Sequence, residues 1–96
     1  MLHLHQYRQI LAQQKQQLLK TYPIKTLGLF GSVVRNDFTS ESDIDVIVEF
    51  TRPVGIEFIE LADDLEKIFQ RKVDLVSRKG LREETFDFIK EEIQYV

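Results

Sequence analysis

The sequence contains no cysteine and no tryptophan, and it has only two prolines and four glycines among its 96 residues. Without cysteine there can be no disulfide framework, and the composition is compatible with the cytosol. No apolar run approaches the length of a membrane span, and the first eight residues lack the apolar core of a signal peptide. We therefore expect a cytoplasmic protein without a membrane segment.

An excess of one charge is also absent. Thirteen lysines and arginines face sixteen aspartates and glutamates, which gives a net charge of −3. A dedicated nucleic-acid binder usually carries a basic face, so this balance argues against direct nucleic-acid binding. Ninety-six residues suffice for one hydrophobic core. We expect a single domain over 1–96, without a second domain to hold a substrate.

The pattern of apolar residues predicts alternating helices and strands. Because period-two runs are short and period-3.6 stripes are longer, the two types separate along the chain. The predicted order α-β-α-β-α-β-α indicates an α/β (α+β) domain, a small mixed β-sheet of about three strands with helices packed on it. We expect helices over 5–22, 55–69 and 81–95, a short helix and a turn within 33–42, and strands over 24–30, 44–50 and 72–76.

Two short motifs flank the first predicted turn. Gly31 and Ser32 close the first strand, and Asp43 and Asp45 open the second, with ten residues between Ser32 and Asp43. A motif at the end of one strand and a motif at the start of the next can share a site only if the two strands are antiparallel. The spacing therefore predicts an antiparallel pair with both motifs at one edge of the sheet.

The two aspartates favour a cation. Side chains two positions apart on a strand share a face, so Asp43 and Asp45 project together. Two carboxylates on one face are costly unless a cation or partner neutralises them. Mg²⁺ binds through one or two carboxylates plus substrate phosphates, and paired metal ions can clamp an in-line phosphoryl displacement. Asp74 lies in the predicted third strand and can join the pair, as a metal ligand or as a general base, if the strands are neighbours.

The glycine–serine motif favours a phosphate. Gly31 has no Cβ, so a phosphate can approach its backbone closely. Ser32 stands at the expected start of a helix, where its hydroxyl and free amides can hold phosphate oxygens. Arg35, one turn further on, can add a charge-assisted donor. Each residue also has a purely structural interpretation: Ser32 as a helix N-cap, Arg35 as a surface residue, and Asp74 as an exposed charge on an edge strand.

These residues carry a resemblance to a known family. Gly31-Ser32, then Ser42-Asp43-Ile44-Asp45, with Asp74 on a later strand, resembles the polymerase-beta-type nucleotidyltransferase superfamily. Within it the chain resembles the minimal nucleotidyltransferases (MNT), which pair with HEPN-domain partners in prokaryotic toxin–antitoxin modules. The similar part covers about residues 24–78. The chain departs from the pattern after Gly-Ser, where Val34 and Asn36 replace a small residue and a glycine.

The resemblance implies a nucleotidyltransferase fold and transfer of a nucleoside monophosphate with loss of pyrophosphate. It implies two Mg²⁺ ions on Asp43, Asp45 and Asp74, with ATP as nucleotide donor. The residues assigned to nucleotide binding are Gly31, Ser32, Arg35 and Ser42.

The resemblance also implies a partner. We expect an antitoxin that assembles with a HEPN-domain toxin and transfers AMP to a hydroxyl of it, that of a tyrosine. One alternative is a non-catalytic antitoxin that neutralises its partner by complex formation. Another is a free-standing enzyme that modifies a small molecule, which the short chain disfavours.

Overall fold

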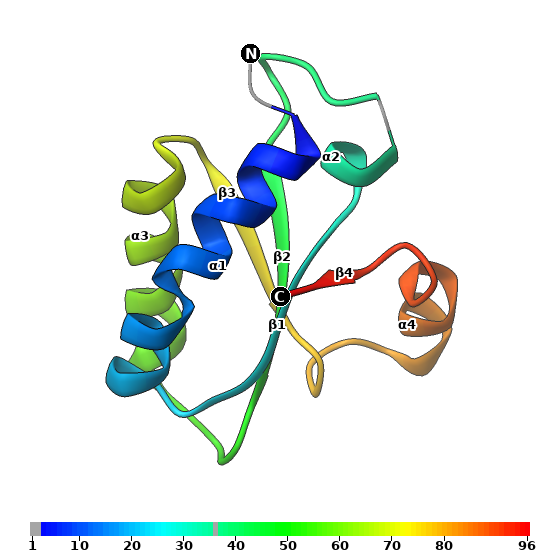
Figure 1. Cartoon of the computed structure of the whole chain (residues 1–96). Helices are drawn as coiled ribbons and strands as arrows, with labels where there is room; N and C mark the ends of the chain where they lie inside the picture. The colour runs from blue at the N-terminus through cyan, green and yellow to red at the C-terminus, as the bar shows by residue number, and fades with distance from the viewer. Residues whose placement is uncertain (1–2, 36) are drawn as a thin grey trace.

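The computed structural model describes residues 3–35 and 37–96 (Figure 1). The predicted alternation of helices and strands is confirmed through the third strand, with bounds that agree within one residue, because long periodic stripes and short apolar runs are strong local signals. The elements are α1 (Leu4–Thr21), β1 (Ile24–Phe30), α2 (Ser32–Arg35), β2 (Ile44–Phe50), α3 (Ile56–Phe69), β3 (Val73–Ser77), α4 (Glu83–Ile89) and β4 (Gln94–Tyr95).

The strands form one mixed sheet in the order β3-β2-β1-β4. β1 is antiparallel to β2, as the spacing of the two motifs predicted, and it is also antiparallel to β4. β2 and β3 are parallel, and α3 forms the crossover between them. The described residues therefore form a four-stranded sheet, one strand more than the sequence predicted.

The extra strand corrects our prediction for the C-terminus. A helix over 81–95 was wrong: α4 ends at Ile89, and the chain turns to form β4. The pairing of Gln94 with Leu29 and of Tyr95 with Gly28 outweighs helix continuation. Gly28 makes this possible, because a Cβ there would lie 2.8 Å from Ile93 Cγ2.

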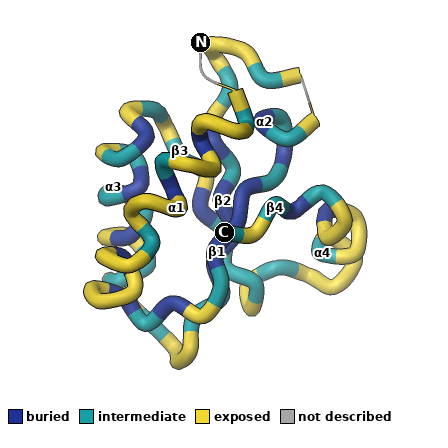
Figure 2. The backbone as a smooth tube through the Cα atoms, in the orientation of Figure 1, coloured by how far each residue is buried: buried dark blue, intermediate teal, exposed yellow. Residues whose placement is uncertain are grey.

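The main core lies between the sheet and the two long helices. Helices α1 and α3 cover one face of the sheet, and α4 lies on the other side (Figure 1). The buried strands run through the middle of the molecule (Figure 2). Fully buried members of this core come from four elements, and they include Leu11, Leu27, Val46, Leu61 and Leu65.

Alternation along β2 decides which residues face the second side. Ile44, Val46 and Val48 belong to the main core, whereas Ile47 packs with Ile89 and Ile93 in a smaller cluster under α4. Since neighbouring side chains on a strand point to opposite faces, Asp45 lies on the same side as Ile47. Asp45 thus lies on the face of the sheet that the two long helices leave uncovered.

Within the residues that the structure describes, no helix has the length and apolar character needed to cross a membrane.

Candidate functional site

The glycine–serine bend and the start of β2 lie side by side. Phe30, the last residue of β1, pairs with Asp45 in the antiparallel register. The next residue, Gly31, has a φ of +79°, a conformation that residues with side chains rarely adopt. A Cβ on Gly31 would collide with the Asp45 carboxylate. Both the backbone turn and the close approach of Asp45 therefore require glycine at this position.

The third predicted aspartate also lies at this edge. Asp74 in β3 is the register partner of Asp45 in the parallel β2–β3 pair. Neighbouring strands are about 4.8 Å apart, so these two carboxylates come from adjacent backbone positions. Asp45 is half-buried, while Asp43 and Asp74 are exposed. The structure thus brings the three aspartates to one edge of the sheet.

The electrostatics show that these carboxylates interact. The pKa of Asp45 is raised from 3.8 to about 6, first by burial and then by the negative charges of Asp74 and Asp43. The guanidinium of Arg35 acts against this, and the carboxylate of Glu92 adds to it. Asp45 is therefore harder to ionise than an ordinary aspartate.

This crowding fits a divalent cation. Carboxylate oxygens are the ligands that Mg²⁺ prefers, and a bound cation would relieve the repulsion around Asp45. Across residues 3–35 and 37–96, however, no three Asp, Glu, His or Cys side chains are arranged so that they could hold an ion by themselves. The geometry fits an ion bound by one or two carboxylates together with substrate phosphates and water. The assignment of two ions to all three aspartates stays a prediction.

Two of the predicted phosphate-binding residues, Gly31 and Ser32, form the start of helix α2. The Gly31 carbonyl accepts hydrogen bonds from the amides of Val34 and Arg35, at 3.0 and 3.2 Å. Gly31 therefore takes the N-cap position, and Ser32 is the first residue of α2 rather than its cap. The alternative that Ser32 serves only as an N-cap is wrong. Asn36, where the sequence departs from the family pattern, lies outside the described residues.

Arg35 is oriented by acidic side chains. Its Nη1 lies 3.2 Å from Glu92 Oε2, and its Nη2 lies 3.7 Å from Asp37 Oδ2. Half of its side chain is exposed (50%), so the guanidinium can be reached from solvent. Arg35 is therefore paired, and a phosphate would have to take the place of one of its partners.

Ser42 makes local contacts in the loop that leads to Asp43. Its Oγ accepts a hydrogen bond from the Thr39 amide, at 3.0 Å. These contacts close the turn 39–42 just before β2. Its assignment to the nucleotide stays a prediction.

Sequence reasoning missed two residues of this region. Glu92 accepts a hydrogen bond from the Gly31 amide, with 2.5 Å between nitrogen and Oε2. This contact could not be predicted from a helix over 81–95, because such a helix would not bring Glu92 beside β1 and the bend that follows it. Arg71 donates to the carbonyl oxygens of the loop 39–42, with its Nη2 at 2.9, 3.1 and 2.6 Å from Thr39, Ser40 and Ser42 respectively. Nothing in the local sequence marks Arg71 for this contact.

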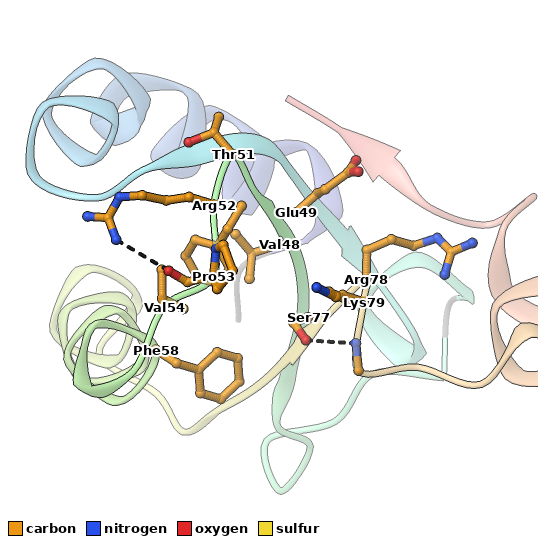
Figure 3. A pocket seen from close by; sticks show the side chains of 12 residues that line it. Val48, Glu49, Thr51, Arg52, Pro53, Val54, Phe58, Ser77, Arg78 and Lys79 are labelled. Carbon is orange, nitrogen blue, oxygen red and sulfur yellow. Dashed lines mark hydrogen bonds between the residues drawn. The ribbon is translucent and has the colours of Figure 1, made fainter.

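A separate cavity lies away from this site. A cavity of about 780 Å³ opens where β2 and β3 end, at the far end of both strands from Asp45 and Asp74 (Figure 3). Its walls include Phe58 from α3, Ser77 from β3 and Arg78 after it. None of the predicted site residues lines this cavity, so its size says nothing about the aspartate edge.

Comparison with known proteins yields relatives over most of the chain. A proposed protein adenylyltransferase of Methanocaldococcus jannaschii is 42% identical over 81 residues, which are 81% of either chain. The protein adenylyltransferase MntA of Thermococcus cleftensis is 34% identical over 97 aligned positions, covering 100% of this chain and 98% of the relative.

Two solved structures share the fold. A proposed minimal nucleotidyltransferase superposes with a TM-score of 0.82 at 23% identity, over 97% of this chain and 95% of the other. A chain in the structure of a tri-AMPylated Shewanella oneidensis HEPN toxin in complex with MNT antitoxin gives 0.68 at 22% identity, over 93% and 70%. Residues 11–96 match the family described as the nucleotidyltransferase domain. With that match and these relatives, the chain belongs to the nucleotidyltransferase domain family.

Proposed function

We propose that this chain transfers AMP from ATP, with Mg²⁺, to a hydroxyl of a HEPN-domain toxin, that of a tyrosine side chain, and so acts as its antitoxin. The family supports nucleotidyl transfer, and a relative that spans the chain is named a protein adenylyltransferase. The observation that carries the proposal is the position of Asp45, which lies against Gly31 on one side and beside Asp74 on the other. A phosphate group at the glycine would therefore meet both carboxylates.

The binding roles follow from the contacts at the bend. The Gly31 amide and the Arg35 guanidinium both face an acidic oxygen in the structure, so they suit phosphate oxygens. Ser32 is the first residue of α2, and its hydroxyl would add a third donor. When bound, Mg²⁺ would neutralise charge that builds up on the phosphates. Asp43 and Asp45 would hold the ion together with phosphate oxygens.

The chemical step places Asp74 at the acceptor. The oxygen of the acceptor hydroxyl forms a bond to the α-phosphorus of ATP, and the bond from that phosphorus to the bridging oxygen breaks. Pyrophosphate leaves, and the hydroxyl proton passes to the Asp74 carboxylate. Asp74 is exposed on β3, which is an edge strand of the sheet. A side chain from another protein can therefore reach it, which is what a protein acceptor requires.

The test combines the chain with the product of the neighbouring gene, which our proposal expects to be a HEPN-domain protein, and with ATP and Mg²⁺. We expect the partner to gain the mass of one or more AMP groups, and Asp45→Asn to abolish that gain. Asp63→Asn is the matched control, because Asp63 is an exposed aspartate of α3, in the helix layer on the other face of the sheet. Its activity should match that of the wild type.

Two other results would overturn the proposal. Neutralisation of the partner without any mass gain, surviving Asp45→Asn, would show a non-catalytic antitoxin. Turnover of ATP with a small hydroxyl compound, and none with the partner, would show a free-standing enzyme.

A further inference from the structure

Glu92 reaches the glycine bend because of the C-terminal strand. Ile93 is buried in the small cluster with Ile47, and Gln94 pairs with Leu29 two residues before Gly31. These contacts bring the chain back along β1 toward its end, so that the residue before Ile93 stands at the bend. Only 19% of the Glu92 side chain is exposed. The backbone position of Glu92 beside the bend is thus fixed by the fold.

The Glu92 carboxyl group is held by two donors. Its Oε2 lies 2.5 Å from the Gly31 nitrogen and 3.2 Å from Arg35 Nη1. A backbone amide and a guanidinium that converge on one oxygen form a binding place for a carboxylate or phosphate oxygen. The sequence assigned these same two residues to the phosphates of the nucleotide. In the structure, an acidic group of the chain itself occupies that place.

Glu92 belongs to a group of acidic side chains. The pKa of Asp45 is raised first by burial, then by the charges of Asp74 and Asp43, and Glu92 acts on it in the same direction. Arg35 offsets this only in part, because its guanidinium is half exposed and also 3.7 Å from Asp37. A ligand that brought its own cation would relieve this repulsion, whereas Glu92 adds to it.

We propose that Glu92 is a further residue of the nucleotide site, an internal anion that fills the phosphate position on Gly31 and Arg35 until a triphosphate displaces it. This inference rests on the proposed function, and it adds what competes with the nucleotide. The main chain of β4 stays in place, since Val96 donates to the Leu27 carbonyl at 2.9 Å and accepts from Lys15 Nζ at 2.7 Å. The Glu92 side chain alone rotates away. Glu92 therefore lowers the affinity for the nucleotide.

The test measures binding of Mg²⁺-ATP by equilibrium dialysis, with no acceptor present. Glu92→Gln keeps an oxygen that can accept from the Gly31 amide but removes the charge. We expect its dissociation constant to fall by about tenfold, the size of one charge-assisted contact. Glu91→Gln is the matched control, because it removes the same charge from the exposed neighbouring residue. Its dissociation constant should equal that of the wild type.

A second measurement reads the bend directly. The chain has four glycines, so labelling them with ¹⁵N gives a spectrum of four backbone amides. Glu92→Gln should shift the Gly31 signal and leave those of Gly55 and Gly80 unchanged. Inorganic tripolyphosphate should shift the wild-type Gly31 signal toward a bound position that the variant reaches at a lower concentration. Thermal unfolding of each variant checks that the fold is intact.

The outcomes separate the two proposals. Equal binding of ATP by wild type and Glu92→Gln would overturn the role of Glu92 and leave the proposed function standing. Weaker binding by Glu92→Gln would also overturn it, because Glu92 would then support the ion or the nucleotide. Failure of every variant to bind ATP, with wild-type folding, would overturn the proposed function itself.

Discussion

A side-chain carbon on Gly31 would overlap the carboxylate of Asp45. The bend after β1 and the start of β2 therefore pack closely against each other. This close packing is possible only because residue 31 is glycine. Its positive φ adds a second requirement for glycine. This relationship allows the steric effect and the backbone effect to be measured separately.

We expect Gly31→Ala to lower the free energy of unfolding by about 1–3 kcal/mol and to reduce AMP transfer by about 100-fold, because the Asp45 carboxylate is pushed from its place. Urea denaturation and a transfer assay measure the two effects. In an Asp45→Ala background the collision is gone, and the loss of stability should shrink to the backbone part, about 1 kcal/mol. An equal loss in both backgrounds would contradict the steric explanation.

The raised pKa of Asp45 predicts a cost to stability. The folded chain keeps the Asp45 proton up to about pH 6, whereas 3.8 is the ordinary value of the pKa. Between these values the folded state binds more protons, so this residue's contribution to stability falls as the pH rises. Asp45→Asn cannot ionise. It should be more stable than the wild type by about 1 kcal/mol near pH 7, after allowance for its partial exposure.

Urea denaturation without divalent cations, at about pH 4 and about pH 7, checks this prediction. The difference between Asp45→Asn and the wild type should nearly vanish at the lower pH. Asp63→Asn, an exposed aspartate outside the site, is the control substitution. A constant difference at both pH values would show that the effect comes from packing and not from ionisation.

Asp74 and Asp45 should differ in the step that each supports. Asp74 is exposed on the outer strand, where it faces the acceptor in our proposal. Asp74→Asn should lower kcat by a factor of about 10² to 10⁴, the usual contribution of a general base, with little change in the dissociation constant of Mg²⁺-ATP. Asp45→Asn should weaken binding of Mg²⁺-ATP itself. Identical effects of the two substitutions on binding would assign Asp74 to the ion alone.

Arg71 should act as a positioning residue for the loop before Asp43. One of its nitrogens binds three carbonyl oxygens of that loop, and its guanidinium lies 4.5 Å from the centre of the Phe38 ring. Lysine keeps the charge but cannot reproduce the planar fork. We expect Arg71→Lys to raise the KM for Mg²⁺-ATP several-fold. The melting temperature should fall by only a few degrees.

Arg52→Lys is the control for this substitution. Arg52 is exposed at the far end of β2 and pairs with Glu57 at 3.6 Å. Its kinetic constants should stay at wild-type values. If the KM for Mg²⁺-ATP in Arg71→Lys also stayed unchanged, the loop would not depend on Arg71 for its position.

Much of the fold could be predicted because its signals are local. The bounds of β1 and β2 agree with prediction residue for residue, since both are apolar runs bounded by turn residues. The antiparallel pairing followed from the spacing of Gly31 and Asp43. That Asp74 joins Asp43 and Asp45 needed one further assumption, that β2 and β3 are neighbours, and the structure confirms that they are.

The errors came from contacts between distant residues. Phe86, Ile89 and Ile93 have a spacing that suits a helix, so the local pattern gave no reason to end α4 at Ile89. β4 pairs with β1, which lies more than sixty residues away in the sequence. The two strands can approach each other only because Gly28 in β1 has no side chain. Glu92 was missed for the same reason, because its contact exists only once β4 has formed. The roles assigned to the predicted site residues all stay predictions.

Side chains of β2 alternate between the main core and the face that carries Asp45, so substitutions along the strand should have different effects. Substitutions of Ile44, Val46 and Val48 remove buried contacts and should reduce the amount of folded protein, whatever the assay. Polar replacements of Asp45, on the opposite face, should leave abundance intact and remove function. In a library of all single variants, cellular abundance would therefore fall at Ile44, Val46 and Val48, and also at the buried Ile47, whereas at Asp45 activity alone would fall. A loss of activity without a loss of abundance would mark the site-bearing position of the strand without any coordinates.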